Sequence, residues 1–128
     1  MNIYLAKFAA WIVQSFVMTD RLQQLIDFLA ENPDDPFLNY ALATEHLKLG
    51  HVEDALRYYE GLVEKHPGYV GTYYHLGKLY ETLGRQDHAI AVYEKGMHSA
   101  RAKRDMHALS ELQAAYRAAT GIDDDDDE

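Results

Sequence analysis

The sequence predicts an all-α protein in which helix–turn–helix hairpins stack side by side as an α-solenoid. Three observations lead to this prediction. The chain repeats itself at a spacing of 34 residues, apolar residues within each copy recur at the spacing of one helix face, and a glycine follows the first helix of each copy. The chain has 128 residues, of which 48% are hydrophobic and 26% charged, which is enough apolar material for one domain with its own core.

Charge and cysteine content exclude several classes of protein. The net charge is −9, and the last six residues are all acidic, so the rest of the chain carries −3. Binding to nucleic acid requires a basic surface that neutralises phosphates, and we therefore expect no nucleic-acid partner. Because the chain has no cysteine, it can form no disulfide, thiolate metal site or cysteine nucleophile, and we expect a cytoplasmic protein.

Residues 1–17 are the most apolar part of the chain, with Lys7 as their only charged residue. A membrane-spanning helix needs about 20 apolar residues, and no cleavage site of a signal peptide follows this segment. We therefore predict neither a membrane span nor secretion. Two interpretations remain open: the segment is either a degenerate first helix over residues 3–16, or an extension that precedes a true start of translation at Met18.

Residues 18–33 contain an amphipathic helix, predicted between Asp20 and Glu31. Its apolar residues recur at the spacing of one helix face, and the helix lies where the second helix of a preceding hairpin would fall. Arg21 stands where such a helix usually has a small residue. The apolar face consists of Leu22, Leu25, Ile26 and Leu29.

The two copies of the repeat occupy residues 34–69 and 70–103. In the first copy, Asp35 and Pro36 are typical of a helix start, and Gly50 is typical of a helix end. Gly84 has the corresponding place in the second copy. Small residues on the paired helices should let them approach closely. These small residues are Ala43 and Ala55 in the first copy, and Gly77 and Ala89 in the second.

The spacing within each copy resembles the tetratricopeptide repeat, in which a large residue, Leu-Gly and Tyr lie on the first helix and Ala and an aromatic residue on the second. The second copy reads Tyr73-x-x-Leu76-Gly77-x-x-Tyr80, then Ala89-x-x-x-Tyr93. The first copy reads Asn39-x-x-Leu42-Ala43-x-x-His46, then Ala55-x-x-x-Tyr59, and closes with Pro67. The departures at Asn39 and His46 suggest that the first repeat packs against something atypical. The resemblance covers residues 36–103 and implies a right-handed stack of hairpins.

A last helix is predicted within residues 104–121, where Asp105 can cap its start and Gly121 can end it. The end of a solenoid needs such a helix with a polar outer face, so we interpret it as a C-terminal capping helix. Residues 122–128 carry a run of like charges that cannot fold against its own repulsion. We predict a disordered acidic tail there.

No motif in the sequence indicates catalysis, a cofactor or a metal ion. The seven histidines form no HExxH motif, and no two of them have the i, i+4 spacing of a metal-binding pair on a helix. The three serines lie outside any GxSxG motif, and no glycine-rich loop is present to hold phosphates. We therefore predict a protein without catalytic, cofactor or metal sites, whose histidines are scattered and solvated. They are His46, His51, His66, His75, His88, His98 and His107.

The first helices of the two copies share a second face, about 100° around each helix from the face that packs on the partner helix. Stacked, these faces resemble the concave groove with which the family binds peptides. Aromatic residues beside two lysines suit a segment with apolar and acidic side chains. The alternative is that the aromatic residues only pack between adjacent helices. The predicted partner-binding residues are Phe37, Tyr40, Thr44, Leu47, Lys48, Tyr74, Lys78, Glu81 and Thr82.

These features predict a non-catalytic protein–protein interaction module that binds a peptide segment or a partner protein. The resemblance argues against the tails of heat-shock chaperones as ligands, because Tyr40 and Thr44 occupy positions where the family's carboxylate clamp has Lys and Asn. The alternative prediction is a structural protein that forms a homodimer through its end helices or its apolar N-terminus.

Overall fold

The structure is a computed structural model that describes residues 3–121, with the side chains of residues 13–19 outside the description. Within residues 3–121 the chain forms six helices and no strand, which confirms the all-α prediction. The helices belong to two compact units, Met1–Tyr58 and Tyr59–Glu128, and each unit is described by itself. The predicted acidic tail lies outside the described residues.

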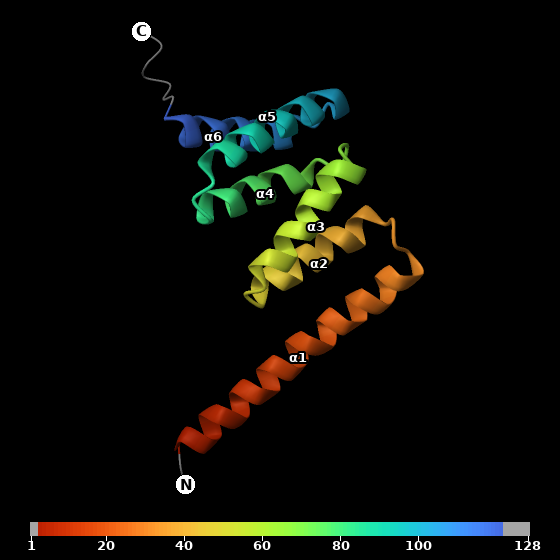
Figure 1. Cartoon of the computed structure of the whole chain (residues 1–128), viewed down its shortest axis with the longest axis vertical. Helices are drawn as coiled ribbons and strands as arrows, with labels where there is room; N and C mark the ends of the chain where they lie inside the picture. The colour runs from red at the N-terminus through yellow and green to blue at the C-terminus, as the bar shows by residue number, and fades with distance from the viewer. Residues whose placement is uncertain (1–2, 122–128) are drawn as a thin grey trace. The chain divides into compact units, whose positions relative to one another are not determined.

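The helices follow one another with short connections (Figure 1). In the first unit α1 packs against α2, and in the second unit α5 packs against both α4 and α6. The third helix, α3, begins in the first unit and ends in the second. The bounds of the helices are α1 (Ile3–Glu31), α2 (Pro36–Lys48), α3 (Val52–Lys65), α4 (Gly71–Thr82), α5 (Gln86–Lys103) and α6 (Met106–Thr120).

The first helix, α1, is one continuous helix of 29 residues. This corrects the interpretation of residues 3–16 as the first helix of a hairpin, because the backbone continues past Phe16 without a turn (Figure 1). No glycine or proline occurs between Ile3 and Glu31, so this stretch lacks the residues that usually end a helix. Neither α1 nor any other helix described between residues 3 and 121 has the length and apolar character needed to cross a bilayer.

The second half of α1 packs against α2. Leu25 is buried in this contact, and Nε of Arg21 donates a hydrogen bond to Oε2 of the buried Glu45 at 3.3 Å. Arg21 therefore contacts α2 at a position where the repeat usually has a small residue. The ion pair matters because a buried carboxylate without a partner is strongly unfavourable.

Two helix starts have the caps that the sequence predicts. The Asp35 side chain accepts a hydrogen bond from the Leu38 N–H at 3.2 Å, and Pro36 is the first residue of α2. The Asp105 side chain accepts from the Ala108 N–H at 3.0 Å at the start of α6. Each cap satisfies a backbone donor that has no partner inside the helix.

Three helix ends depend on a glycine in the left-handed conformation. Gly50, Gly84 and Gly121 have φ angles of +80°, +74° and +73°, after α2, α4 and α6. Residues with a side chain rarely adopt these angles. The three helix ends predicted at these glycines are therefore confirmed.

The core of the second unit forms where α5 packs between α4 and α6. Gly77 on α4 lies against the fully buried ring of Tyr93, which occupies the space that a Cβ at position 77 would need. On α5, a Cβ at Gly96 would lie 2.6 Å from the Cβ of Tyr73 and 3.0 Å from Cδ1 of Leu112. The absence of a side chain at these two glycines thus allows α5 to approach both neighbours closely.

A methyl group at position 77 tests the contact between α4 and α5. Gly77→Ala places a Cβ against the Tyr93 ring, and we expect it to lower the free energy of unfolding by about 1–3 kcal/mol. Gly61→Ala is the matched control, because Gly61 lies within α3 and a Cβ there meets no atom of another segment within 4 Å.

The control should raise the free energy of unfolding by about 0.5–1 kcal/mol, because alanine favours helix more than glycine does. Urea denaturation followed by circular dichroism measures both values. Equal effects of the two substitutions would contradict the close approach at Gly77.

Candidate functional site

In the first unit, the predicted groove residues lie along α2 with different exposure. Phe37 is 60% exposed and Leu47 is 38% exposed. Lys48 is also exposed, whereas Tyr40 and Thr44 are half-buried. The Thr44 hydroxyl donates to the Tyr40 carbonyl at 3.0 Å within the helix. The helix therefore presents apolar side chains near both its ends and a basic one near its C-terminus.

In the second unit, Tyr74 and Lys78 line a hollow of about 280 Å³ between α4 and α6. Lys78 Nζ lies 5.6 Å from the centroid of the Tyr74 ring, within the range of a cation–π contact. The hollow thus combines an aromatic ring, an ammonium group and an aliphatic wall. The residues of α6 that line it are Glu111, Ala114, Ala115 and Ala118.

Glu81 and Thr82, the other two predicted partner-binding residues of α4, make hydrogen bonds within the second unit. Oε2 of Glu81 accepts a hydrogen bond from the Tyr93 hydroxyl at 2.5 Å and lies 3.5 Å from Lys78 Nζ. Burial, reinforced by the Glu81 carboxylate, raises the pKa of the Tyr93 phenol, so its hydroxyl remains a donor. The Thr82 hydroxyl donates to the Lys78 carbonyl at 3.0 Å. Glu81 therefore links the Lys78 side chain to Tyr93 in the core of the second unit.

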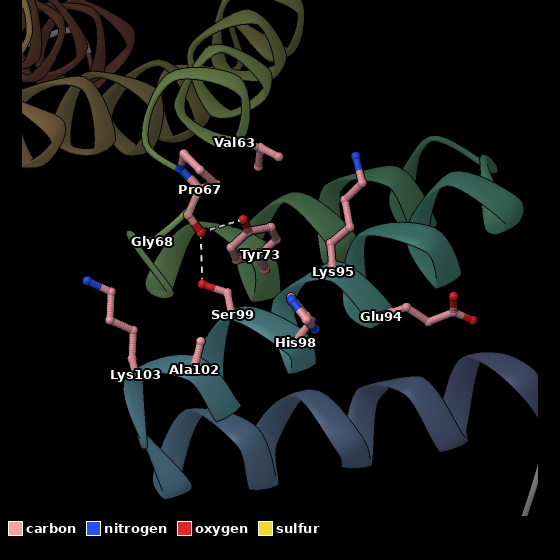
Figure 2. A pocket seen from close by; sticks show the side chains of 10 residues that line it. All are labelled: Val63, Pro67, Gly68, Tyr73, Glu94, Lys95, His98, Ser99, Ala102 and Lys103. Atoms are coloured by element: carbon pink, nitrogen blue, oxygen red, sulfur yellow. Dashed lines mark hydrogen bonds between the residues drawn. The ribbon is translucent and has the colours of Figure 1, made fainter.

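A larger cleft, of about 630 Å³, lies between the end of α3 and α5 (Figure 2). The Pro67 carbonyl accepts two hydrogen bonds there, from the Tyr73 hydroxyl at 2.6 Å and from the Ser99 hydroxyl at 2.8 Å. Burial raises the pKa of the Tyr73 phenol. The sequence pattern predicts no binding site at these residues, because the cleft joins residues up to 40 positions apart that share no motif. The rest of the lining consists of Val63, Gly68, Glu94, Lys95, His98, Ala102 and Lys103.

Two of the histidines lie together in the first unit. The Nδ1 atoms of His46 and His51 are 3.1 Å apart, and a carboxylate oxygen of Asp54 lies within 4.8 Å of the ligand atoms of both. His46 is only 9% exposed, so the prediction of scattered, solvated histidines is wrong for this residue. Burial lowers the pKa of the His46 imidazole, although the charge of Asp54 opposes this shift. Among the described residues, these three side chains could hold a metal ion.

A signal for this cluster is present in the sequence. His46 stands at the position of Tyr80 in the second copy, and His51 stands at the position of Arg85. The two histidines are five residues apart across a glycine turn, which is not the spacing of a metal-binding pair on one helix. The two copies of the repeat differ at both of these positions, one before and one after the Gly50 turn. This pair of differences is the feature of the sequence that indicates a contact between His46 and His51.

Both the sequence and the structure are similar to those of known proteins. The family model described as tetratricopeptide repeat matches residues 40–127. The crystal structure of a tetratricopeptide repeat domain protein from Salinibacter ruber is 54% identical to this chain, with a TM-score of 0.66, and the match covers 70% of this chain and 100% of that one. A search of curated proteins finds no match.

Two further structures share the fold at lower identity. The TPR2B domain of yeast Sti1, in complex with pHsp70, is 14% identical with a TM-score of 0.73, over 90% of this chain and 91% of that one. PcrH, in complex with the chaperone binding region of PopD, is 18% identical with a TM-score of 0.73, over 92% of this chain and 88% of that one. At these identities the likeness shows the fold alone, which is the all-α tetratricopeptide solenoid that the sequence predicts.

Removing the Tyr93 hydroxyl tests how much its hydrogen bond to Glu81 contributes to the free energy of unfolding. Tyr93→Phe keeps the ring that packs on Gly77 but leaves Glu81 without its hydroxyl donor. Because hydrogen bonds to charged groups are the stronger ones, we expect the free energy of unfolding to fall by about 1.5–3 kcal/mol in urea denaturation.

Thr82→Val is the control for this experiment, because it removes an exposed hydroxyl from the same helix. Its effect should stay within about 0.5 kcal/mol. If Tyr93→Phe destabilises the chain no more than Thr82→Val does, the bond to Glu81 does not contribute to stability.

Proposed function

The chain belongs to the tetratricopeptide repeat family, and from this premise we propose that it is a non-catalytic protein-interaction module that binds a peptide segment of a partner protein. We propose two binding surfaces, each within one unit: the hollow between α4 and α6 in the second unit, and the exposed face of α2 in the first. We also propose that the protein acts in the cytoplasm, because its sequence has no cysteine to form the disulfides common in secreted proteins.

The observation that carries this proposal is the hollow between α4 and α6. Tyr74 is half-buried there, so a ligand can bury the rest of its ring at a low cost in side-chain entropy. Lys78 is held between the Tyr74 ring and the Glu81 carboxylate, so its ammonium group is already positioned before a ligand binds. This arrangement suits a peptide that places an apolar side chain against the alanines of α6 and a carboxylate beside Lys78.

The exposed residues of α2 support the same class of ligand. Phe37 and Leu47 expose apolar surface, and Lys48 follows Leu47 directly. Single exposed apolar residues are common on protein surfaces, but here they occur with a lysine at the positions that the repeat pattern assigns to ligand binding. The proposed site on α2 therefore has the same two components as the hollow, an apolar contact and a positive charge.

Two structures with the same fold contain a bound partner. The TPR2B domain of Sti1 is in complex with pHsp70, and PcrH is in complex with the chaperone binding region of PopD. These complexes support the binding of a partner segment as a function that this fold performs. They are similar to this chain in fold alone, so the chemistry of its own ligand is argued from Tyr74 and Lys78.

A double substitution in the hollow tests the proposed site. Peptides selected from a random library against the unsubstituted chain serve as ligands. We expect Tyr74→Ala combined with Lys78→Ala to weaken their binding at least tenfold, because aromatic and basic residues dominate the energy of such contacts. Fluorescence anisotropy measures the affinity, and a tenfold loss corresponds to about 1.4 kcal/mol.

The matched control is Lys95→Ala combined with His98→Ala, which changes two exposed residues of the cleft between α3 and α5. Both double variants should keep their free energy of unfolding within about 1 kcal/mol of the original. Unchanged binding by the hollow variant contradicts the proposed site. Binding that is lost only in the control assigns the ligand to the cleft of Figure 2 instead.

Self-association through α1 is a second candidate function. Six large apolar residues at the start of this helix are between 45% and 76% exposed, and the rings of Phe8 and Trp11 stack with their centroids 6.2 Å apart. Such an apolar surface is typical of a protein interface. Lys7 is the only charged residue between positions 3 and 12, so two copies can meet there with little repulsion. The six residues are Ile3, Tyr4, Leu5, Phe8, Trp11 and Ile12.

Charged substitutions on this surface test the dimer. We expect light scattering to give the mass of a dimer for the unsubstituted chain and that of a monomer for Phe8→Glu combined with Trp11→Glu, because the dimer would have to bury four new charges. Gln24→Glu, on an exposed position of the same helix, is the control and should remain a dimer. A monomer mass for the unsubstituted chain excludes this function.

A further inference from the structure

The turn between α2 and α3 brings His46 and His51 together. Gly50 reverses the backbone with a φ of +80°, the His51 N–H donates to the His46 carbonyl at 2.8 Å, and the Gly50 N–H donates to the Leu47 carbonyl at 3.1 Å. This pair of hydrogen bonds is the Schellman motif, in which the outer two residues commonly make an apolar side-chain contact. Here both of these residues are histidines.

The distances between the side chains suit a four-coordinate metal ion. Two nitrogens bonded to one Zn²⁺ at about 2.05 Å with a tetrahedral angle lie about 3.3 Å apart. The Nδ1 atoms of His46 and His51 are 3.1 Å apart. Asp54, in the first turn of α3, brings a carboxylate oxygen, and the three ligand atoms all lie within 4.8 Å of one another. In a tetrahedral site the three ligand atoms would occupy three of the four corners, with the Asp54 oxygen adjusting its position as the ion binds.

His46 is the best-fixed member of this set. It is buried, and its ring stacks on Tyr58 with centroids 5.5 Å apart and planes 15° apart. His51 is exposed and Asp54 is half-buried. One ligand is therefore held by packing, while the two others are open to solvent and can adjust to an ion that arrives from it.

We propose that His46, His51 and Asp54 bind one Zn²⁺ ion, with water as its fourth ligand. Imidazole nitrogen and carboxylate oxygen are common zinc ligands, and three protein ligands with one water is a common zinc coordination. Mg²⁺ and Ca²⁺ prefer oxygen ligands, so the two imidazoles favour zinc over them. The ion joins the end of α2 to the start of α3, which is a property independent of the proposed peptide binding.

Two charged groups near the site, Arg57 and Glu45, affect which carboxylate can bind the ion. The Arg57 guanidinium donates to Oδ1 of Asp54 one turn along α3, but the Arg57 side chain is 77% exposed. Ion pairs of this exposed kind are weak, so a divalent ion can displace the guanidinium. The second carboxylate near His46 belongs to Glu45, which is already bound to Arg21 at 3.3 Å and stays outside the site.

The second copy shows that the turn does not need these ligands. There Gly84 has a φ of +74°, and the Arg85 N–H donates to the Tyr80 carbonyl at 2.8 Å. The backbone therefore makes the same turn without a pair of histidines. The residues at the three ligand positions in this copy are Tyr80, Arg85 and His88.

Isothermal titration of the full chain with Zn²⁺ tests the proposal. We expect one Zn²⁺ per chain, and binding at least about 100-fold weaker in His46→Tyr and in His51→Arg, because loss of a ligand costs more than loss of the groups that orient it. Both substitutions introduce the residue that the second copy has in the same turn, so the turn should still form. His107→Ala is the control, because His107 pairs with Glu111 at 2.7 Å outside the site.

Two further readouts distinguish a zinc site from adventitious binding. Zn²⁺ should raise the melting temperature of the unsubstituted chain and of His107→Ala, but not that of His51→Arg. Long-range ¹H–¹⁵N spectra should show the Nδ1 resonances of His46 and His51 shifting together as Zn²⁺ is added. Mg²⁺ should produce neither effect.

Three results would overturn the proposal. The first is no Zn²⁺ binding by the unsubstituted chain, in which case the 3.1 Å contact is a hydrogen bond between two neutral imidazoles. The second is binding that survives in His51→Arg, whose exposed position makes it the variant least able to disturb the fold. The third is binding that is lost in His107→Ala, which would assign the ion to the pair on α6.

Discussion

The close approach of α4 and α5 at Gly77 is the constraint on which the second unit depends. The Tyr93 ring is fully buried because Gly77 has no side chain in its way. That position brings the Tyr93 hydroxyl to Glu81, and Glu81 in turn holds Lys78 beside the Tyr74 ring. The hollow between α4 and α6 that we propose for ligand binding is therefore positioned by a contact in the core. Without these contacts, the Lys78 and Glu81 side chains would lose more rotamer entropy when they bind a ligand.

The turns and caps of the fold could be predicted from the sequence because each is decided within about five residues. An aspartate before a helix, or a glycine after one, satisfies backbone groups that are near it in the chain. For residues 3–16 the sequence left two interpretations open, and the one that the structure contradicts, a separate first helix of a hairpin, rests on apolar spacing. That spacing is the same in one long helix as in two shorter ones, and the absence of glycine and proline up to Glu31 was the better guide.

The candidate site could be predicted only in part, for a related reason. The repeat spacing separates Tyr74 and Lys78 from the buried face of α4. It can do so because the face on which a residue lies depends only on its position within that one helix. It could not show that Glu81 is bonded to Tyr93, which lies on another helix. Nor could it show the cleft whose hydrogen bonds join Ser99 to Pro67, 32 residues earlier in the chain. Contacts of this kind follow from packing between helices, and the spacing within one helix carries no information about them.

The two copies of the repeat separate what the backbone determines from what the side chains determine. Both close the turn after their first helix with the same hydrogen bonds around a glycine, after Leu49 and after Leu83. In the second copy, the residues on either side of this turn include Tyr80 and His88, whose rings pack 5.2 Å apart. In the first, the same positions hold His46 and Asp54. Because the glycine turn makes no demand on these side chains, each copy can acquire its own chemistry there without a change in fold.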